Sequence, residues 1–190
     1  INAGVDFWRT HASTLARAER DFGVPPEIVV GIIGVETIYG RIMGNFRVLD
    51  ALATLSFDFP MEHPRADQRL AFSRGELESS LTAASRQGDS PLDALGSYAG
   101  ATGLPQFMPT SIAKYAVDYD GTGHIDLVGS PVDAIGSVAN YFKGYGWEPG
   151  QPSIFPVSVN ESNPFMPTLL APDIVPSFSA DSISAAGVGL

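Results

Sequence analysis

Glu36 is the residue whose surroundings most directly suggest chemistry. It lies near the end of the stretch 27–39, which is apolar through most of its length. A helix that is apolar on every side is buried on every side, so we expect apolar neighbours around Glu36. Because desolvation disfavours the charged form of a carboxyl group, such a group stays protonated near neutral pH and can act as a general acid. The alternative, that Glu36 reaches water and has no role, stays open.

An acidic loop that begins at Asp118 follows the first nine positions of an EF-hand calcium loop. In that motif oxygen-bearing side chains occupy positions 1, 3, 5 and 9, a glycine occupies position 6, and position 7 binds through its backbone carbonyl. Position 12 is Gly129 instead of glutamate, so another carboxylate must close the site. The expected ligands are Asp118, Asp120, Thr122, His124 (by its carbonyl) and Asp133, with Asp126 at position 9. The alternatives are an Asp-Gly turn without metal, and an Asp133 that only stabilises the start of its helix.

The glycine-rich segment 96–109 is a candidate for binding a ligand through its backbone and side chains. Ser97 and Gln106 offer hydrogen bonds suited to sugar hydroxyl and amide groups, and Phe107 and Met108 offer apolar faces. An ordinary connecting loop, with the Phe and the Met in the core, is the competing interpretation. Downstream aromatic residues that could line a glycan groove, or equally belong to the core, are Tyr141, Tyr145 and Trp147.

The elements that must position these residues are mainly helices, so we expect a mainly α fold. Apolar spacing, prolines at helix starts and glycines after helix ends predict helices over 6–22, 27–39, 48–57, 66–87 and 109–117, and helix starts at 90–93 and 130–133. The segments 96–108 and 118–129 are expected to be loops. We divide the chain into a helical domain, 1–150, and a Pro- and Ser-rich partial β-containing subdomain, 151–190, with a β-leaning piece at 154–159.

Composition narrows the classes of function. The chain of 190 residues has a net charge of −10, no cysteine and 44% hydrophobic residues. A phosphate backbone is bound through clusters of Lys and Arg, so the charge argues against nucleic acid. The lack of cysteine excludes disulfides, thiolate zinc sites and cysteine nucleophiles in this chain. No apolar run approaches the roughly 18 residues that span a bilayer, and we expect any export signal to lie outside these residues.

Taken together, these motifs resemble the membrane-bound lytic transglycosylase B family, glycoside hydrolase family 103. The resemblance runs from about Phe7 to Trp147 and rests on several motifs in the same order. They are GIIGVET at 31–37, ALATLSF at 51–57, GELE at 75–78, GSYAG at 96–100, QFMP at 106–109, the loop at Asp118, and PVDAIGSVANYF at 131–142.

The resemblance implies a lysozyme-like helical core with an EF-hand-type calcium loop. It implies that Glu36 is the catalytic residue and that Ser97, Gln106 and Tyr141 contact the substrate. It implies metal ligands at Asp118, Asp120, Thr122, His124 and Asp133, with calcium in a structural role and no cofactor for the chemistry. Two departures stand out: the loop is one residue longer before Asp133 with Thr at 122, and the family's C-terminal active-site tyrosines have no match before Leu190. Arg65 and Arg69 are both candidates for the groove arginine.

The implied reaction is cleavage of the bond between N-acetylmuramic acid and N-acetylglucosamine in peptidoglycan without water. Glu36 would protonate the glycosidic oxygen and then accept the proton of the muramyl 6-hydroxyl, which attacks C1 and gives a 1,6-anhydro product. One rival is a lysozyme-type muramidase, which needs a second carboxylate, with Asp50 or Asp58 the nearest in sequence. The other is a non-catalytic, calcium-dependent glycan-binding module.

The resemblance also implies a location and partners. We expect a periplasmic monomer that acts on glycan strands and does not bind nucleic acid, with peptidoglycan synthases as candidate partners. Attachment to the outer membrane through an N-terminal lipid anchor outside this chain stays open.

Overall fold

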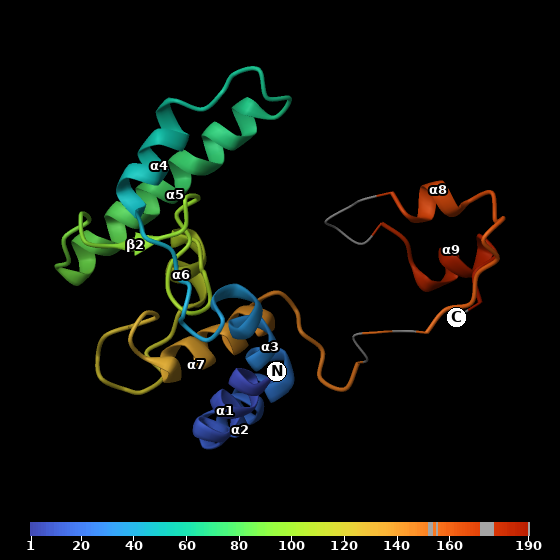
Figure 1. Cartoon of the computed structure of the whole chain (residues 1–190), viewed down its shortest axis with the longest axis horizontal. Coiled ribbons are helices and arrows are strands. Elements are labelled where there is room, and N and C mark those ends of the chain that lie inside the picture. Colours follow the sequence, from blue (N-terminus) through green and yellow to red (C-terminus); the bar gives the residue numbers. More distant parts are fainter. Residues whose placement is uncertain (152–153, 155, 172–176, 190) are drawn as a thin grey trace. The chain divides into compact units, whose positions relative to one another are not determined.

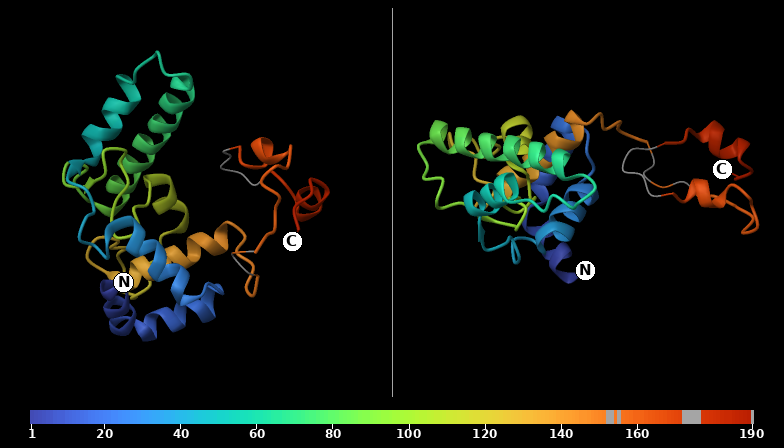
Figure 2. Two further views of the ribbon diagram at one scale, coloured as in Figure 1. Left: turned by 45° about the vertical axis from the view of Figure 1, so that its right-hand side comes forward. Right: turned by 90° about the horizontal axis from the view of Figure 1, so that it is seen from above.

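The computed structural model describes residues 1–151, 154, 156–171 and 177–189. The chain divides into two units, 1–149 and 150–190. Helices dominate the first unit (Figures 1 and 2), as the mainly α prediction requires. In the described part of the chain, no helix combines the length and the apolar character needed to cross a membrane.

The N-terminal segment forms two helices where the sequence predicted one. α1 runs over Asn2–Thr10 and α2 over Ala12–Phe22, with His11 between them at φ −111° and ψ 20°. The prediction of a continuous helix over 6–22 is therefore wrong. A single non-helical residue leaves the spacing of the apolar residues nearly unchanged, so the sequence pattern does not reveal it. Gly23 ends α2 in the left-handed conformation, with φ 76°, as expected for a glycine after a helix.

The core of the first unit gathers around α3, Pro26–Thr37, and α7, Pro131–Gly144. Both helices begin with a proline in the first turn, where the missing N–H costs no helical hydrogen bond. Ser130 caps α7 by accepting the N–H of Asp133 at 3.2 Å, as its sequence predicted. The buried core residues are Phe7, Leu15, Ala18, Val24, Val29, Val30, Ile33, Leu104, Phe107, Leu127, Ala134, Ile135, Val138 and Ala139.

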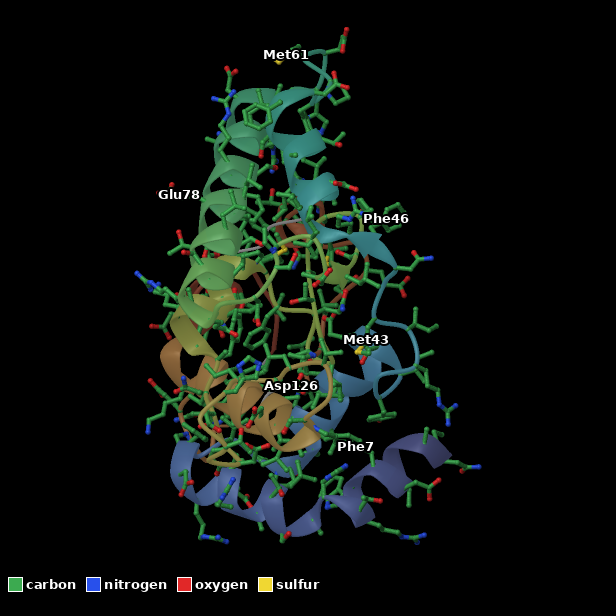
Figure 3. The ribbon with its side chains drawn as sticks, turned by 90° about the vertical axis from the view of Figure 1, so that its left-hand side faces the viewer. Phe7, Met43, Phe46, Met61, Glu78 and Asp126 are labelled. Atoms are coloured by element: carbon green, nitrogen blue, oxygen red, sulfur yellow. The ribbon has the colours of Figure 1, made fainter. Side chains whose placement is uncertain are left out.

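α4, Val48–Phe57, and α5, Ala66–Gln87, form an antiparallel hairpin that projects from this core (Figure 1). Both match the predicted ranges. A second buried cluster of Val48, Leu52 and Leu77 holds the hairpin together. Met61 lies at the tip of the hairpin, far along it from the core helices (Figure 3), and is exposed.

A small antiparallel sheet that the sequence did not predict joins the hairpin to the glycine-rich segment. β1, Phe46–Arg47, pairs with β2, Leu95–Gly96, so that Phe46 faces Gly96. The predicted helix start at 90–93 is wrong: those residues form a turn that leads directly into β2. α6, Pro109–Tyr115, then follows the glycine-rich segment close to its predicted range.

In the second unit, the described residues form two short helices, α8 at Met166–Leu169 and α9 at Ala180–Ala185. The β-leaning piece predicted at 154–159 lies partly outside the described residues. Within those described, its β structure is a single bridge between Ser158 and Gly189. Tertiary context overrides the β tendency of such short pieces.

Candidate functional site

Glu36 occupies the last turn of α3, on the side that the core does not cover. The helix buries Val29, Val30, Ile33 and Thr37, whereas Glu36 is exposed. Among the described residues Glu36 has no hydrogen-bond or ion-pair partner. The prediction that apolar neighbours surround it is therefore wrong, because the helix is apolar on a side that nothing in the described chain covers.

The chain around Glu36 exposes several large apolar side chains. Val35 is 83% exposed and Ile42 is 64% exposed, and Ile38 and Phe46 are also exposed. Figure 3 shows Met43 and Phe46 along the segment that leads from α3 to α4. Exposed apolar surface next to a polar group is typical of a surface that another molecule covers.

The turn after Glu36 is in contact with the glycine-rich segment. The Thr37 hydroxyl donates to the carbonyl of Leu104 at 2.9 Å. The side-chain Nε2 of Gln106 donates to the carbonyls of Met43, at 3.1 Å, and Gly103, at 3.0 Å. Gln106 also has a left-handed backbone, with φ 50°. The structure thus brings the segments that carry Glu36 and Gln106 together.

Ser97 lies at the start of the same segment. Its Oγ accepts the N–H groups of Ala99, at 3.3 Å, and Ala101, at 3.1 Å. The backbone of Gly44 packs so closely on residues 96–97 that a Cβ at Gly44 would lie 2.6 Å from the Ser97 nitrogen. Ser97 therefore also lies against the segment that follows α3, with its hydroxyl shaping a tight turn.

Of the aromatic candidates, Phe107 and Tyr141 pack against the core of the first unit, whereas Tyr145 is 66% exposed. Phe107 is 6% exposed, and its ring lies 5.2 Å from that of Tyr141. The ring of Tyr141 also contacts Tyr115 and Tyr145, at 5.1 and 4.6 Å. Burial, followed by the Tyr145 hydroxyl, raises the pKa of Tyr141. Phe107 thus fits the interpretation as a core residue.

Met108 and Trp147 also belong to the packing of the first unit. Met108 is partly buried against Val48 and Leu52. Trp147 packs on the main core, and its indole N–H donates to the carbonyl of Gly23 at 2.9 Å. For these two residues as well, the core interpretation fits the structure.

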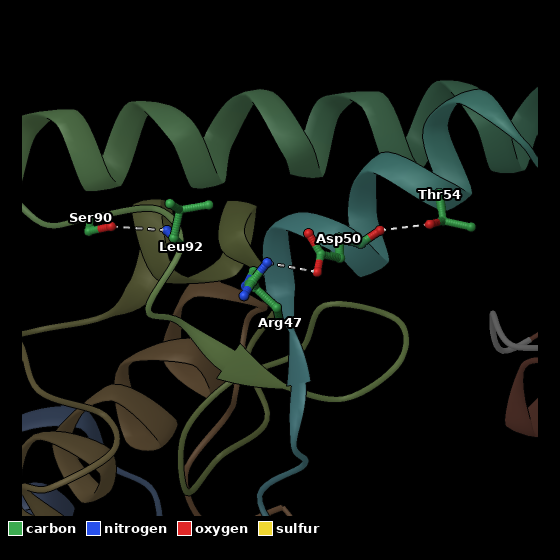
Figure 4. Close-up of polar contacts among 5 residues, drawn as sticks. All are labelled: Arg47, Asp50, Thr54, Ser90 and Leu92. Atoms are coloured by element: carbon green, nitrogen blue, oxygen red, sulfur yellow. Dashed lines mark hydrogen bonds and ion pairs between the residues drawn. The ribbon is translucent and has the colours of Figure 1, made fainter.

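The residues proposed for a second catalytic carboxylate lie on α4 and at its end. Asp50 forms an ion pair with Arg47 at 3.2 Å (Figure 4), and Asp58 follows the last residue of α4. Both are exposed, as are Arg65 and Arg69 on the far side of the hairpin turn. No hydrogen bond or ion pair of the described residues joins any of them to Glu36.

The acidic loop gathers three of the predicted metal ligands. One carboxylate oxygen from each of Asp118, Asp120 and Asp133 lies within 4.8 Å of the others. The Thr122 hydroxyl donates to the carbonyl of His124 at 3.2 Å. The other two predicted ligands, Thr122 and His124, therefore lie next to each other. This set of hard oxygen donors fits a calcium ion. A hydrogen bond from Ser130 holds the pKa of Asp120 below its usual range.

Asp133 has a third role that neither sequence interpretation included. It is fully buried, and one of its oxygens accepts the N–H groups of Tyr119 and Asp120, at 2.7 and 3.0 Å. The other accepts the N–H of Asp126 at 2.9 Å. Asp133 thus ties both ends of the loop to α7.

Asp126, at position 9, turns away from this group. Its carboxylate accepts the N–H groups of Val128 and Gly129, at 2.9 and 2.7 Å, and so closes a local turn. Asp126 is not part of the carboxylate group that Asp118, Asp120 and Asp133 form.

Three pockets of the first unit are lined by described residues other than Glu36. One of about 410 Å³ is formed by α5, residues 89–95 and residues 124–128. Two others, of about 390 and 340 Å³, lie beside α2 and beside α5. Glu36 lines none of these three.

Thr37 and Glu76 are buried polar residues that the sequence interpretation missed. Glu76 is 2% exposed and accepts a hydrogen bond from Thr110.

Comparison with known proteins gives consistent relatives. The family model described as the transglycosylase SLT domain matches residues 1–185. The membrane-bound lytic murein transglycosylase B of Escherichia coli is 48% identical over 188 residues, which are 99% of this chain and 48% of that protein. This chain therefore spans about half the length of that curated relative.

Solved structures agree in fold. The soluble lytic transglycosylase SltB1 of Pseudomonas aeruginosa is 49% identical, with a TM-score of 0.87 over 99% of this chain and 60% of that one. The E. coli lytic transglycosylase Slt35 in complex with calcium is 46% identical, with a TM-score of 0.82 over 98% and 55%. SltB3 of P. aeruginosa in complex with NAG-anhNAM-pentapeptide is 38% identical, with a TM-score of 0.72 over 84% and 40%. The chain belongs to the family of transglycosylase SLT domains.

Proposed function

We propose that this chain provides the catalytic acid and base of a lytic transglycosylase that cleaves the β-1,4 bond from N-acetylmuramic acid to N-acetylglucosamine in peptidoglycan. The observation that carries the proposal is the position of Glu36. It is an unpaired, accessible carboxyl group at the end of α3, next to the segment that bears Gln106, in a chain of the SLT family. A relative bound to NAG-anhNAM-pentapeptide supports the anhydro product.

In the proposed reaction Glu36 donates its proton to the glycosidic oxygen as the bond from C1 breaks. The substrate's acetamido group stabilises the positive charge at C1. The ionised Glu36 then accepts the proton of the muramyl 6-hydroxyl, whose oxygen forms the new bond to C1. The acid is thereby regenerated and no water is consumed.

Because Glu36 is exposed, the bound substrate must itself exclude water from the carboxyl group. A general acid must hold its proton until the bond breaks. A glycan laid over Glu36 and its exposed neighbours Val35 and Ile42 would exclude water, and desolvation disfavours the ionised carboxyl group. We propose that the bound strand supplies the water-excluding surroundings that the described residues do not provide.

Gln106 would act as an acceptor toward the sugar. Both hydrogens of its amide group are directed at backbone carbonyls, which also fixes the orientation of the amide. Its Oε1 then remains for an N–H or O–H group of the substrate. Ser97 and Tyr141 are proposed to contribute from the flanking segments, and Met108 through the part of its side chain that the core leaves open.

The test is a comparison of Glu36→Gln with Asp50→Asn on purified peptidoglycan, with products identified by mass spectrometry. We expect 1,6-anhydro ends from the unmodified protein and from Asp50→Asn, and no cleavage by Glu36→Gln although it still binds the strands. Reducing ends that depend on Asp50 would instead indicate a muramidase. Full activity of Glu36→Gln would exclude Glu36 as the catalyst.

We further propose that the loop at 118–133 binds calcium in a structural role. Asp118, Asp120 and Asp133 would supply carboxylate oxygens, with Thr122 and the His124 carbonyl beside them. The structure of the relative Slt35 is known in complex with calcium. The ion would neutralise the gathered carboxylates and stabilise the loop on α7, without taking part in the reaction.

The proposed setting is the periplasm of a Gram-negative bacterium, because the curated relative is a membrane-bound murein transglycosylase of E. coli. Glycan strands are the proposed substrate. A monomeric state and association with peptidoglycan synthases remain proposals.

A further inference from the structure

The side chain next to Glu36 is a buried hydroxyl group. Thr37 is the last residue of α3 and has 0% exposure. Its Oγ1 donates to the carbonyl of Leu104 at 2.9 Å and accepts the N–H of Gly40 at 3.0 Å. The carbonyl of Ile33, at 3.2 Å, is the longer alternative acceptor. Since a hydroxyl group has one hydrogen, the shorter bond ties the end of α3 to a residue 67 positions away.

The backbone after Thr37 is held in a strained conformation. Ile38 and Tyr39 have φ values of 52° and 60°, in the left-handed region that is unfavourable for residues other than glycine. The Tyr39 ring stacks on that of Phe7 at 5.0 Å. Its hydroxyl fits so closely against α3 that a Cβ on Gly34 would lie 2.5 Å away. Such strain persists where the surroundings fix the backbone, and it gathers at functional sites.

The other partner in this contact is equally constrained. Leu104 is 4% exposed, and its N–H donates to the carbonyl of Leu127 at 2.8 Å. It follows Gly103, whose φ is 72°, and precedes Gln106, whose φ is 50°. A shift of Leu104 would therefore move the proposed substrate acceptor Gln106 with it.

We propose that Thr37 is a positioning residue, whose hydroxyl sets the place of the Glu36 carboxyl group relative to the segment that carries Gln106. The inference rests on the proposed function of Glu36. The second link, from Gln106 to Met43, cannot replace it, because Met43 lies beyond the left-handed turn and Gly40. Thr37 acts one peptide bond from Glu36, where a displacement is passed directly to the carboxyl group.

The test compares Thr37→Val with Thr37→Ser. Valine keeps the shape of threonine and removes the hydroxyl, whereas serine keeps the hydroxyl and removes the methyl group. Because a misplacement of about 1 Å can cost about 100-fold in rate, we expect Thr37→Val to lower kcat by roughly 10- to 100-fold on solubilised glycan strands. KM should change much less, and Thr37→Ser should stay close to the unmodified protein.

Folding is controlled by assaying each variant at a temperature where circular dichroism shows it fully folded. A purely structural role would lower Tm in Thr37→Val and leave kcat of the folded protein unchanged, and that result would overturn the inference. So would a Thr37→Ser variant as slow as Thr37→Val.

The single variants Glu36→Gln and Thr37→Val, assayed side by side, separate this inference from the proposed function. An active Glu36→Gln refutes the proposed function itself. An inactive Glu36→Gln beside a fully active Thr37→Val refutes only the role of Thr37.

Discussion

The carboxylate of Glu76 holds Thr110 by two hydrogen bonds, from the backbone N–H at 2.9 Å and from the hydroxyl at 2.6 Å. Glu76 lies on α5 and Thr110 in the first turn of α6. The bond therefore joins the projecting hairpin to the helix that follows the QFMP segment. At 2% exposure, a carboxylate that lost these donors would remain buried without partners.

We predict that Glu76→Gln lowers the free energy of unfolding by about 1 kcal/mol, because a hydrogen bond to a charged group is worth about 1.5–3 kcal/mol and a neutral one about 0.5–1.5 kcal/mol. The amide can accept the Thr110 N–H through Oε1 and donate Nε2 to the Thr110 hydroxyl, so both bonds lose the charge that strengthens them. Urea unfolding followed by circular dichroism measures the change.

The matched control is Glu78→Gln on the same helix. Glu78 is exposed and points away from the fold (Figure 3), so its change should stay within about 0.5 kcal/mol. Equal losses in the two variants would mean that the Thr110 bonds contribute nothing specific.

The start of a helix could be predicted from the sequence where the residues that follow it pack in the core. Ser130 and Ser90 begin the same pattern of Ser, Pro, any residue and Asp. After Ser130 the chain continues into buried Ala134 and Ile135, and a helix forms. After Ser90 it reaches Leu95, which is exposed and pairs with Arg47 in a strand. Local capping signals cannot reveal that long-range pairing.

The orientation of α3 was only partly predictable. Val30, Ile33 and Thr37 follow one another at spacings of three and four, which places them on one face, and all three are buried. That register would have put Thr37 inside and Glu36 outside. The many other apolar residues, such as the exposed Val35, concealed it, because an apolar residue in a sequence does not show whether anything covers it.

Calcium affinity should rise when position 5 of the acidic loop regains a carboxylate. Thr122 is exposed beside Asp118 and Asp120, and calcium affinity increases with the number of charged ligands. We predict that Thr122→Asp tightens calcium binding by roughly tenfold, as measured by isothermal titration calorimetry. Without calcium the same variant should unfold more easily, because it adds a like charge.

The neutral variant Thr122→Asn separates charge from side-chain size. Its calcium affinity should stay within a few-fold of that of the unmodified protein. If Thr122→Asp bound calcium no more tightly than Thr122→Asn, the added charge at position 122 would not act on the ion.

Stability should depend on pH through His11. Burial lowers the pKa of this imidazole, whose ring lies 4.6 Å from that of Phe7. The unfolded chain then binds more protons than the folded one between the folded pKa and about 6.5, so stability rises with pH in this window. The contribution is complete above about pH 6.5 and declines as the pH falls toward the folded pKa.

The control for this effect is His11→Phe, which keeps an aromatic ring against Phe7 and removes the titrating group. Denaturant unfolding from about pH 5 to 8 should show the unmodified protein losing stability relative to the variant as the pH falls. Parallel curves for the two proteins would exclude His11 as the source.

Gly44 should be the least replaceable glycine near the proposed site. Its φ is 89°, and a Cβ there would lie 2.1 Å from the carbonyl oxygen of Gly96 and 2.6 Å from the nitrogen of Ser97. Backbone atoms cannot move aside as a flexible side chain does. We predict that Gly44→Ala pushes the backbone at residue 44 away from residues 96–97 and lowers the free energy of unfolding by more than about 2 kcal/mol.

The contrasting variant is Gly75→Ala. Gly75 lies within α5, and a Cβ at this position would meet no atom within 4 Å, so alanine should stabilise the helix by about 0.5–1 kcal/mol.

Because Gly44 adjoins Ser97, Gly44→Ala should also lose glycan-cleaving activity at temperatures where the variant is still folded. This loss should exceed what the lower stability explains. If Gly44→Ala kept both stability and activity, the close approach of residue 44 to Ser97 would not be part of the functional arrangement.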